Sequence, residues 1–140
     1  MGLGDRLEAL GRELGDREAG FSDELREARA RAEELRAGVA EALGRFHAAA
    51  GKAGAAHLSL ELSAVRVDDK HVRAFEFVLV RGSHRAIVTV KSRGEVTLVG
   101  PFQVGKQEGP CRSFPLAPSD EFALAFEAFL ASFVEDAVTP

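Results

Sequence analysis

Residues 75–90, FEFVLVRGSHRAIVTV, decide the fold class of this 140-residue chain. Apolar side chains occupy every second position on both sides of a short Arg-Gly-Ser sequence, and a period of two predicts β-strands. A turn at Gly82-Ser83 joins the two strands into an antiparallel hairpin and places Phe77 opposite Val88. One face of the hairpin is then apolar throughout, at Phe75, Phe77, Leu79, Ala86, Val88 and Val90.

The same alternation continues on either side and extends the hairpin to a sheet over residues 57–104. The outer strands carry Leu58, Leu60 and Leu62 before the hairpin and Val96, Leu98 and Phe102 after it. Because links as short as Asp69-Lys70 permit only antiparallel neighbours, we predict a four-stranded meander in order 1-2-3-4. A tight first turn places Leu62 beside Phe77. A three-residue turn relaxed by Gly94 brings Val90 opposite Leu98.

The other face of this sheet also carries apolar residues. Val78 lies across from Ile87 in the predicted register, and the patch comprises Val78, Val80, Ile87 and Val99. Such a patch on the second side of a sheet indicates an interface or a support for a helix. The alternative is that central strands are simply apolar on both sides.

The first fifty residues have a helical pattern. Apolar residues recur every seven positions, at Leu7, Leu14, Phe21, Ala28, Leu35 and Ala42, and the stripe changes phase near Gly15 and Gly20. Since glycine weakens a helix by about 1 kcal/mol relative to alanine, we predict a break there. A short, frayed helical arm within residues 1–20 then precedes a long amphipathic helix over residues 22–50.

The long helix predicts self-association. At 1.5 Å per residue it extends about 40 Å, which exceeds the core of a domain of this size. A second copy of the chain would cover the remainder of its stripe, so Leu25, Leu35 and Val39 join the sheet patch as the predicted homodimer interface. The alternative is that the helix lies diagonally across its own sheet.

After the sheet, residues 105–118 contain three prolines and two glycines, which predicts an irregular loop. Ser119 then caps a final helix over residues 119–137. Its four phenylalanines, at positions 122, 126, 129 and 133, share one face. We expect that face to pack on the Phe77 side of the sheet. The chain is therefore predicted to be a single α+β domain.

Composition bounds the class of protein. The net charge of −4 combines acidic ends with a basic middle, and the single cysteine, Cys111, excludes an internal disulfide. No apolar run approaches the ~20 residues of a membrane span, and the charged N-terminus is unlike a signal peptide. We therefore expect a cytoplasmic protein without a membrane partner.

No motif in the chain predicts catalysis, a metal site or a cofactor. Cys111 has a basic neighbour but no oriented base, and no pair of histidines has the spacing of metal ligands. An alternative function is binding of a small ligand or anion by the 105–118 loop and the basic sheet region. Its candidate residues are Lys106, Arg112, Arg85 and Lys91.

Nucleic-acid binding is a weaker alternative. Proteins that read single strands on a sheet present aromatic side chains on its exposed face, whereas Phe75, Phe77 and Phe102 all fall on the predicted core face. The order helix, antiparallel meander, helix is similar to that of small dimeric bacterial proteins, including nucleoid-associated proteins and secretion chaperones. The prediction is a non-enzymatic, homodimeric interaction module of the adaptor or chaperone-like kind.

Overall fold

A computed structural model describes residues 2–68, 73–106 and 109–139 of the chain. Two helices come first, α1 (Leu3–Ala19) and α2 (Ser22–Lys52), and the axis bends between them at Gly20 and Phe21. A sheet follows, and helix α3 (Asp120–Val138) ends the described chain. The predicted α+β order of long N-terminal helix, antiparallel sheet and C-terminal helix is confirmed, including the break near residue 20.

The described strands form one antiparallel sheet with six members. They are β1 (Glu61–Leu62), β2 (Arg66–Val67), β3 (Ala74–Arg81), β4 (His84–Lys91), β5 (Glu95–Gln103) and β6 (Cys111–Pro115). The order is β1-β3-β4-β5-β6, and β2 pairs with the same edge of β3 as β1 does. From β3 to β6, strands that follow one another in the sequence pair in space, as the meander prediction requires.

The register of the central hairpin agrees with the prediction. Phe77 pairs with Val88, and Leu79 pairs with Ala86. The β4–β5 turn has the predicted three residues, because Lys91 pairs with Glu95 and the Gly94 amide donates to the Lys91 carbonyl. However, Val90 pairs with Val96 rather than Leu98, which is a shift of two residues along the same face.

The first predicted turn is wrong in its register. Leu62 pairs with Leu79 and not with Phe77. The predicted strand over residues 57–62 forms a ladder only at its end, and a second short ladder follows, in which Val67 pairs with Phe75. The connection between β2 and β3 is thus longer than two residues. The predicted turn residues Asp69 and Lys70, like His71, lie outside the described part of the chain.

The prediction of an irregular 105–118 segment is also wrong in part. Residues 111–115 form β6, which pairs with β5 through Phe114 opposite Val96 and Ser113 opposite Thr97. Pro110 precedes this strand and Pro115 is its last residue, so neither proline interrupts it. Because an edge strand uses only one side of its backbone, a proline at its end costs no ladder hydrogen bond.

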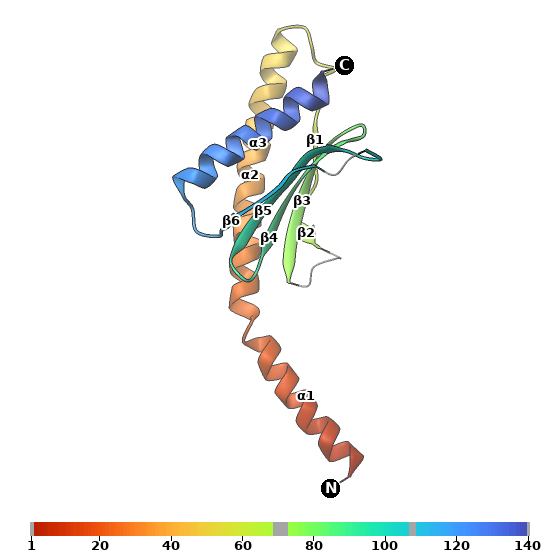
Figure 1. The fold of residues 1–140 in the computed structure, drawn as a ribbon, viewed down its shortest axis with the longest axis vertical. Helices are drawn as coiled ribbons and strands as arrows, with labels where there is room; N and C mark the ends of the chain where they lie inside the picture. The colour runs from red at the N-terminus through yellow and green to blue at the C-terminus, as the bar shows by residue number, and fades with distance from the viewer. Residues whose placement is uncertain (1, 69–72, 107–108, 140) are drawn as a thin grey trace.

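Helices α2 and α3 both cover one face of the sheet, as Figure 1 shows. The core lies between them and the predicted apolar face. Phe77, Val88 and Phe133 are fully buried in it. The N-terminus of α3 is capped as predicted, because the Ser119 hydroxyl accepts from the Phe122 amide at 3.1 Å. The α3 phenylalanines pack against the Phe77 side of the sheet, as the sequence indicated.

Candidate interaction surface

Helix α1 presents four exposed leucines, which we call the leucine row: Leu3, Leu7, Leu10 and Leu14. Their exposed fractions are 79%, 58%, 41% and 51%. The 4-3-4 spacing places all four on one side of the helix. Helix α1 has no buried residue, and Figure 1 shows it extending away from the sheet and from the other two helices. A row of large apolar side chains is therefore left in water.

Among the described residues, the side chain of Arg73 links the C-terminal end of α1 to the sheet domain. Arg73 forms an ion pair with Glu18, and its guanidinium carbon lies 4.2 Å from the centre of the Phe21 ring. Along the arm, Glu8 pairs with Arg12 at 3.4 Å and Glu13 with Arg17 at 3.2 Å. These i,i+4 pairs stabilise a helix by a few tenths of a kcal/mol each. They leave the leucine row uncovered.

Glycines make α1 a weak helix by itself. Gly4, Gly11 and Gly15 lie within it, and a β-carbon at any of them would meet no atom within 4 Å. Each costs about 1 kcal/mol of helix stability relative to alanine, so local packing does not explain them. An exposed helix of this length depends on tertiary or intermolecular contacts for most of its stability. Both facts favour a partner for α1.

The residues of the long helix that were predicted to form the interface lie in the core of their own chain. Leu35 and Val39 are 7% and 0% exposed within a single chain, and Leu25 packs against the same core. Helix α2 lies across its own sheet, which was the alternative to the dimer interpretation, and its buried residues belong to the same core as those of α3. The surplus of apolar surface predicted for α2 is therefore found on α1 instead.

The predicted sheet patch is assembled on the face opposite the helices, which we call the open face. Val78 pairs with Ile87, and Ile87 pairs with Val99, in one row across three strands. Strand β6 extends that row to Cys111, which the prediction of a loop had missed. Val80 lies in the adjacent row. Val78 is only 7% exposed, so this face offers much less apolar area than the leucine row.

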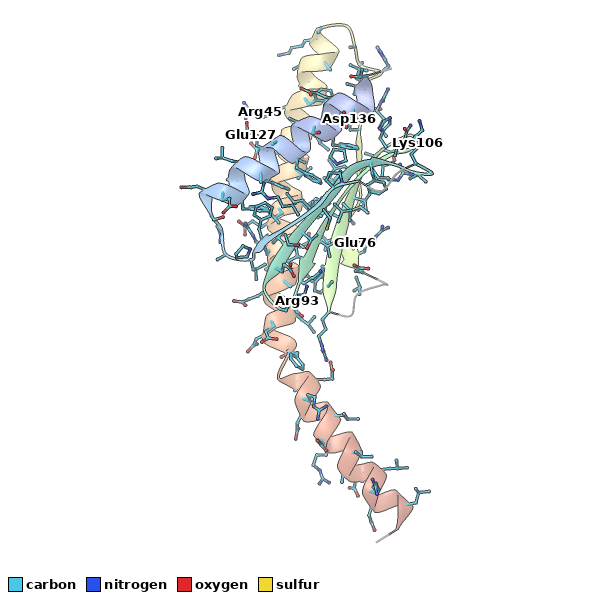
Figure 2. The ribbon with its side chains drawn as sticks, in the orientation of Figure 1. Arg45, Glu76, Arg93, Lys106, Glu127 and Asp136 are labelled. Atoms are coloured by element: carbon cyan, nitrogen blue, oxygen red, sulfur yellow. The ribbon has the colours of Figure 1, made fainter. Side chains whose placement is uncertain are left out.

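The predicted anion-binding residues do not converge. Lys91 and Arg85 are six residues apart on β4, about 20 Å along the strand. Lys106 follows β5 at the opposite end of the sheet from Arg93, as Figure 2 shows. Arg112 lies over Phe114 and pairs with Glu121 of α3 at 3.1 Å. Lys91 lies 3.9 Å from Glu95, and the Arg85 guanidinium donates to the Gly82 and His84 carbonyls.

Other reactive residues have structural surroundings. Cys111 is an exposed free thiol on β6. His47 accepts a hydrogen bond from the Leu60 amide at 3.0 Å and so ties the end of α2 to the segment before β1. In the described ranges, no group of three or more histidine, cysteine, aspartate or glutamate side chains is arranged to hold a metal ion.

Two of the hollows that border α3 are lined mainly by apolar groups. One, of about 280 Å³, lies between α3 and the β5–β6 end and is lined mainly by apolar groups, with Arg112 at one side. The other, of about 370 Å³, lies between α2 and α3 and includes Arg31, Phe122 and Phe126. The Arg31 guanidinium lies over the Phe122 ring and pairs with Glu34. In both hollows the arginine already takes part in contacts within the fold.

None of the described helices combines the length and the apolar character that crossing a bilayer requires. No family model, curated protein or solved structure matches this chain. The leucine row of α1 is the most exposed apolar feature among the described residues.

Proposed function

We propose that this chain is a homodimeric protein-interaction module that self-associates through the leucine row of α1. The observation that carries the proposal is the exposure of four leucines, between 41% and 79%, on one side of a helix that buries nothing in its own chain. Large apolar side chains at 4-3-4 spacing are the pattern by which two helices pack side by side.

The energetics favour a partner over solvent. Full burial of a leucine contributes roughly 1.5–3 kcal/mol, so further burial of four leucines per chain offsets the helix cost of three glycines, which is about 3 kcal/mol. Both helices of a pair would gain order at the same time. This coupling links folding of α1 to association.

A second copy fits α1 better than a membrane surface does. Helix α1 carries three arginines against five acidic residues. Helices that lie on membranes are generally rich in lysine and arginine on the polar side, because biological membranes are negatively charged. An acidic helix is repelled by such a surface. A helix with both signs of charge can pair with a copy of itself.

Such a dimer suits an adaptor or chaperone-like role. Two sheet domains would be held on one helical stem, with the open face of each available to other proteins. The single cysteine also fits a reducing compartment, and we propose the cytoplasm as its location.

The test is the mass in solution. The full-length chain is measured by light scattering and by sedimentation equilibrium across a micromolar dilution series. We expect twice the chain mass of 15.0 kDa. The variant Leu7→Glu/Leu10→Glu places two charges in the centre of the row and should be monomeric with an intact sheet domain.

The matched control is Leu124→Glu. Leu124 is a 71% exposed leucine on α3, away from the row, so its replacement should leave the dimer unchanged. A monomer at every concentration would refute the proposal. So would a dimer that tolerates both substitutions in the leucine row.

A further inference from the structure

We infer that two copies of α1 pair in the antiparallel direction, with Arg6 of each copy facing Glu13 of the other. The inference rests on the proposed self-association and specifies its partner segment and orientation. It is carried by the charges beside the leucine row, since the row itself would suit either direction.

The leucine row divides α1 into two edges. Residues that precede Leu7 and Leu14 along the chain, Arg6 and Glu13, lie on one edge of the row. Gly4 and Gly11, which follow Leu3 and Leu10, lie on the other edge. Glu18 continues that edge two helical turns after Gly11. One edge thus carries opposite charges seven residues apart, and the other is bare over the same length.

Antiparallel pairing brings like edges together. Leu7 of one helix then packs against Leu10 of the other, and Leu3 packs against Leu14. At 1.5 Å per residue, this places Arg6 within about 3 Å, along the axis, of Glu13 in the second copy. The twofold axis repeats the pair, so both charged edges are satisfied, and the two glycine edges meet with no side chain between them.

Parallel pairing brings unlike edges together and has no such match. Arg6 would face Gly11, and Glu13 would face Glu18 of the second copy, which are like charges. Glu18 is also held in an ion pair with Arg73 of its own chain. The charge pattern therefore penalises the parallel dimer and favours the antiparallel one.

The surroundings of Arg6 within its own helix agree with this pairing. The residues three and four positions from it are Gly2, Leu3, Ala9 and Leu10, none of which is acidic. Arg6 forms no ion pair with the residues that the structure describes, whereas Arg12 and Arg17 each pair within the helix. Arg6 is thus available to a second copy.

Disulfide trapping tests the direction. In a Cys111→Ser background, which removes the native thiol, cysteines replace Leu3, Leu14 or both, and Leu7 and Leu10 remain. The chains are equilibrated in a glutathione redox buffer, so that only cysteines held together stay oxidised. The double variant should form a covalent dimer, and neither single variant should, because like positions are roughly 16 Å apart in an antiparallel pair.

Charge reversal tests the pairing independently. Arg6→Glu should weaken the dimer roughly tenfold by placing two like-charged pairs at the interface, and Glu13→Arg should do the same. The double reversal, Arg6→Glu with Glu13→Arg, should bind more tightly than either single variant, because it restores both pairs of opposite charge between the two copies. Rescue is the decisive readout, since Glu13→Arg alone also removes the Glu13–Arg17 pair within the helix.

The outcomes separate the two proposals. A covalent dimer from Leu3→Cys alone, or a dimer strengthened by Glu13→Arg, would establish the parallel direction and overturn the inference while leaving self-association standing. A dimer that neither the single nor the double cysteine variant can trap would also overturn it. A monomeric wild-type chain would overturn self-association itself.

Discussion

At the scale of a single residue, position 109 leaves no room for a side chain. A β-carbon on Gly109 would lie 2.7 Å from the Pro101 carbonyl oxygen, which is closer than real contacts of this kind. Strand β5 ends nearby, and the Gly100 amide donates to the Pro110 carbonyl at 2.7 Å. The absence of a side chain at Gly109 therefore permits β6 to approach β5.

We expect Gly109→Ala to reduce the free energy of unfolding by about 1–3 kcal/mol, because backbone atoms must move to admit the methyl group. Gly44→Ala is the control. Gly44 lies in α2 with open space around it, so alanine there should stabilise the chain by up to about 1 kcal/mol. Urea denaturation followed by far-ultraviolet circular dichroism measures both, since the chain has no tryptophan or tyrosine. Equal effects at the two positions would contradict the steric argument.

Between elements, Glu95 connects the β4–β5 turn with β6. Its carboxylate accepts two hydrogen bonds from Arg93, at 2.9 and 2.6 Å. The Arg93 bonds, and after them a hydrogen bond from Ser113 of β6, hold the pKa of Glu95 below its ordinary value. A carboxyl group whose pKa is lowered by folding stabilises the folded state above its unfolded pKa, and that contribution disappears as the pH falls through the folded pKa.

Glu95→Gln should therefore be less stable than the wild type at neutral pH, and the difference should shrink as the pH falls below about 5. Denaturation midpoints measured from pH 7 to pH 3 provide the comparison. Arg93→Ala removes the main cause of the lowered pKa and should flatten the same part of the profile. If the Arg93→Ala/Glu95→Gln double variant lost as much unfolding free energy as the two single variants added together, Arg93 and Glu95 would not act as a pair.

At the scale of the elements, the sequence predicted correctly those elements that nearby residues specify. The alternation in residues 75–90 predicted the β3–β4 hairpin and its register, because a two-residue turn leaves no freedom in the pairing. The capping serine and the spacing of the phenylalanines predicted α3. Strand β6 was missed because its hydrogen bonds come from the free edge of β5, and nothing within residues 105–118 records that edge.

At the scale of the whole molecule, the chain consists of a body, residues 21–140, and the α1 arm. The body buries one continuous core between α2, α3 and the sheet. The arm is joined to it through Glu18, Arg73 and Phe21. The body contains every buried residue of the described chain, so we expect its stability to depend little on the arm.

Removal of residues 1–19 should leave a folded, monomeric body. We expect its free energy of unfolding to remain within about 1 kcal/mol of the value for the same body in the full chain, since only an exposed ion pair is lost. Its denaturation midpoint should not depend on protein concentration, whereas the helical signal of the full-length chain should increase with concentration as α1 pairs. A truncated chain that unfolds, or one that still dimerises, would show that α1 has another role.

The sequence alone could not identify which apolar stripe forms the candidate interface. In the sequence, Leu7 and Leu14 belong to the seven-residue stripe, whereas Leu3 and Leu10 flank it. The 4-3-4 spacing of these four leucines before the Gly20 break was the signal that could have identified the row. The longer α2 stripe appeared to be the stronger candidate. Whether a stripe is covered depends on what packs against it, and Leu35 and Val39 are covered by the sheet of their own chain.

The sequence by itself determined the helices, the central strands, their order and the faces that are apolar, because helical and strand periodicity, capping and short turns act over a few residues. The tertiary structure decided which apolar faces meet, where β6 pairs and which stripe stays in water. Those outcomes depend on contacts between residues far apart in the chain, and each face can be buried only once. The apolar stripe that the core leaves uncovered therefore lies on α1, and α1 is where we propose that a second copy binds.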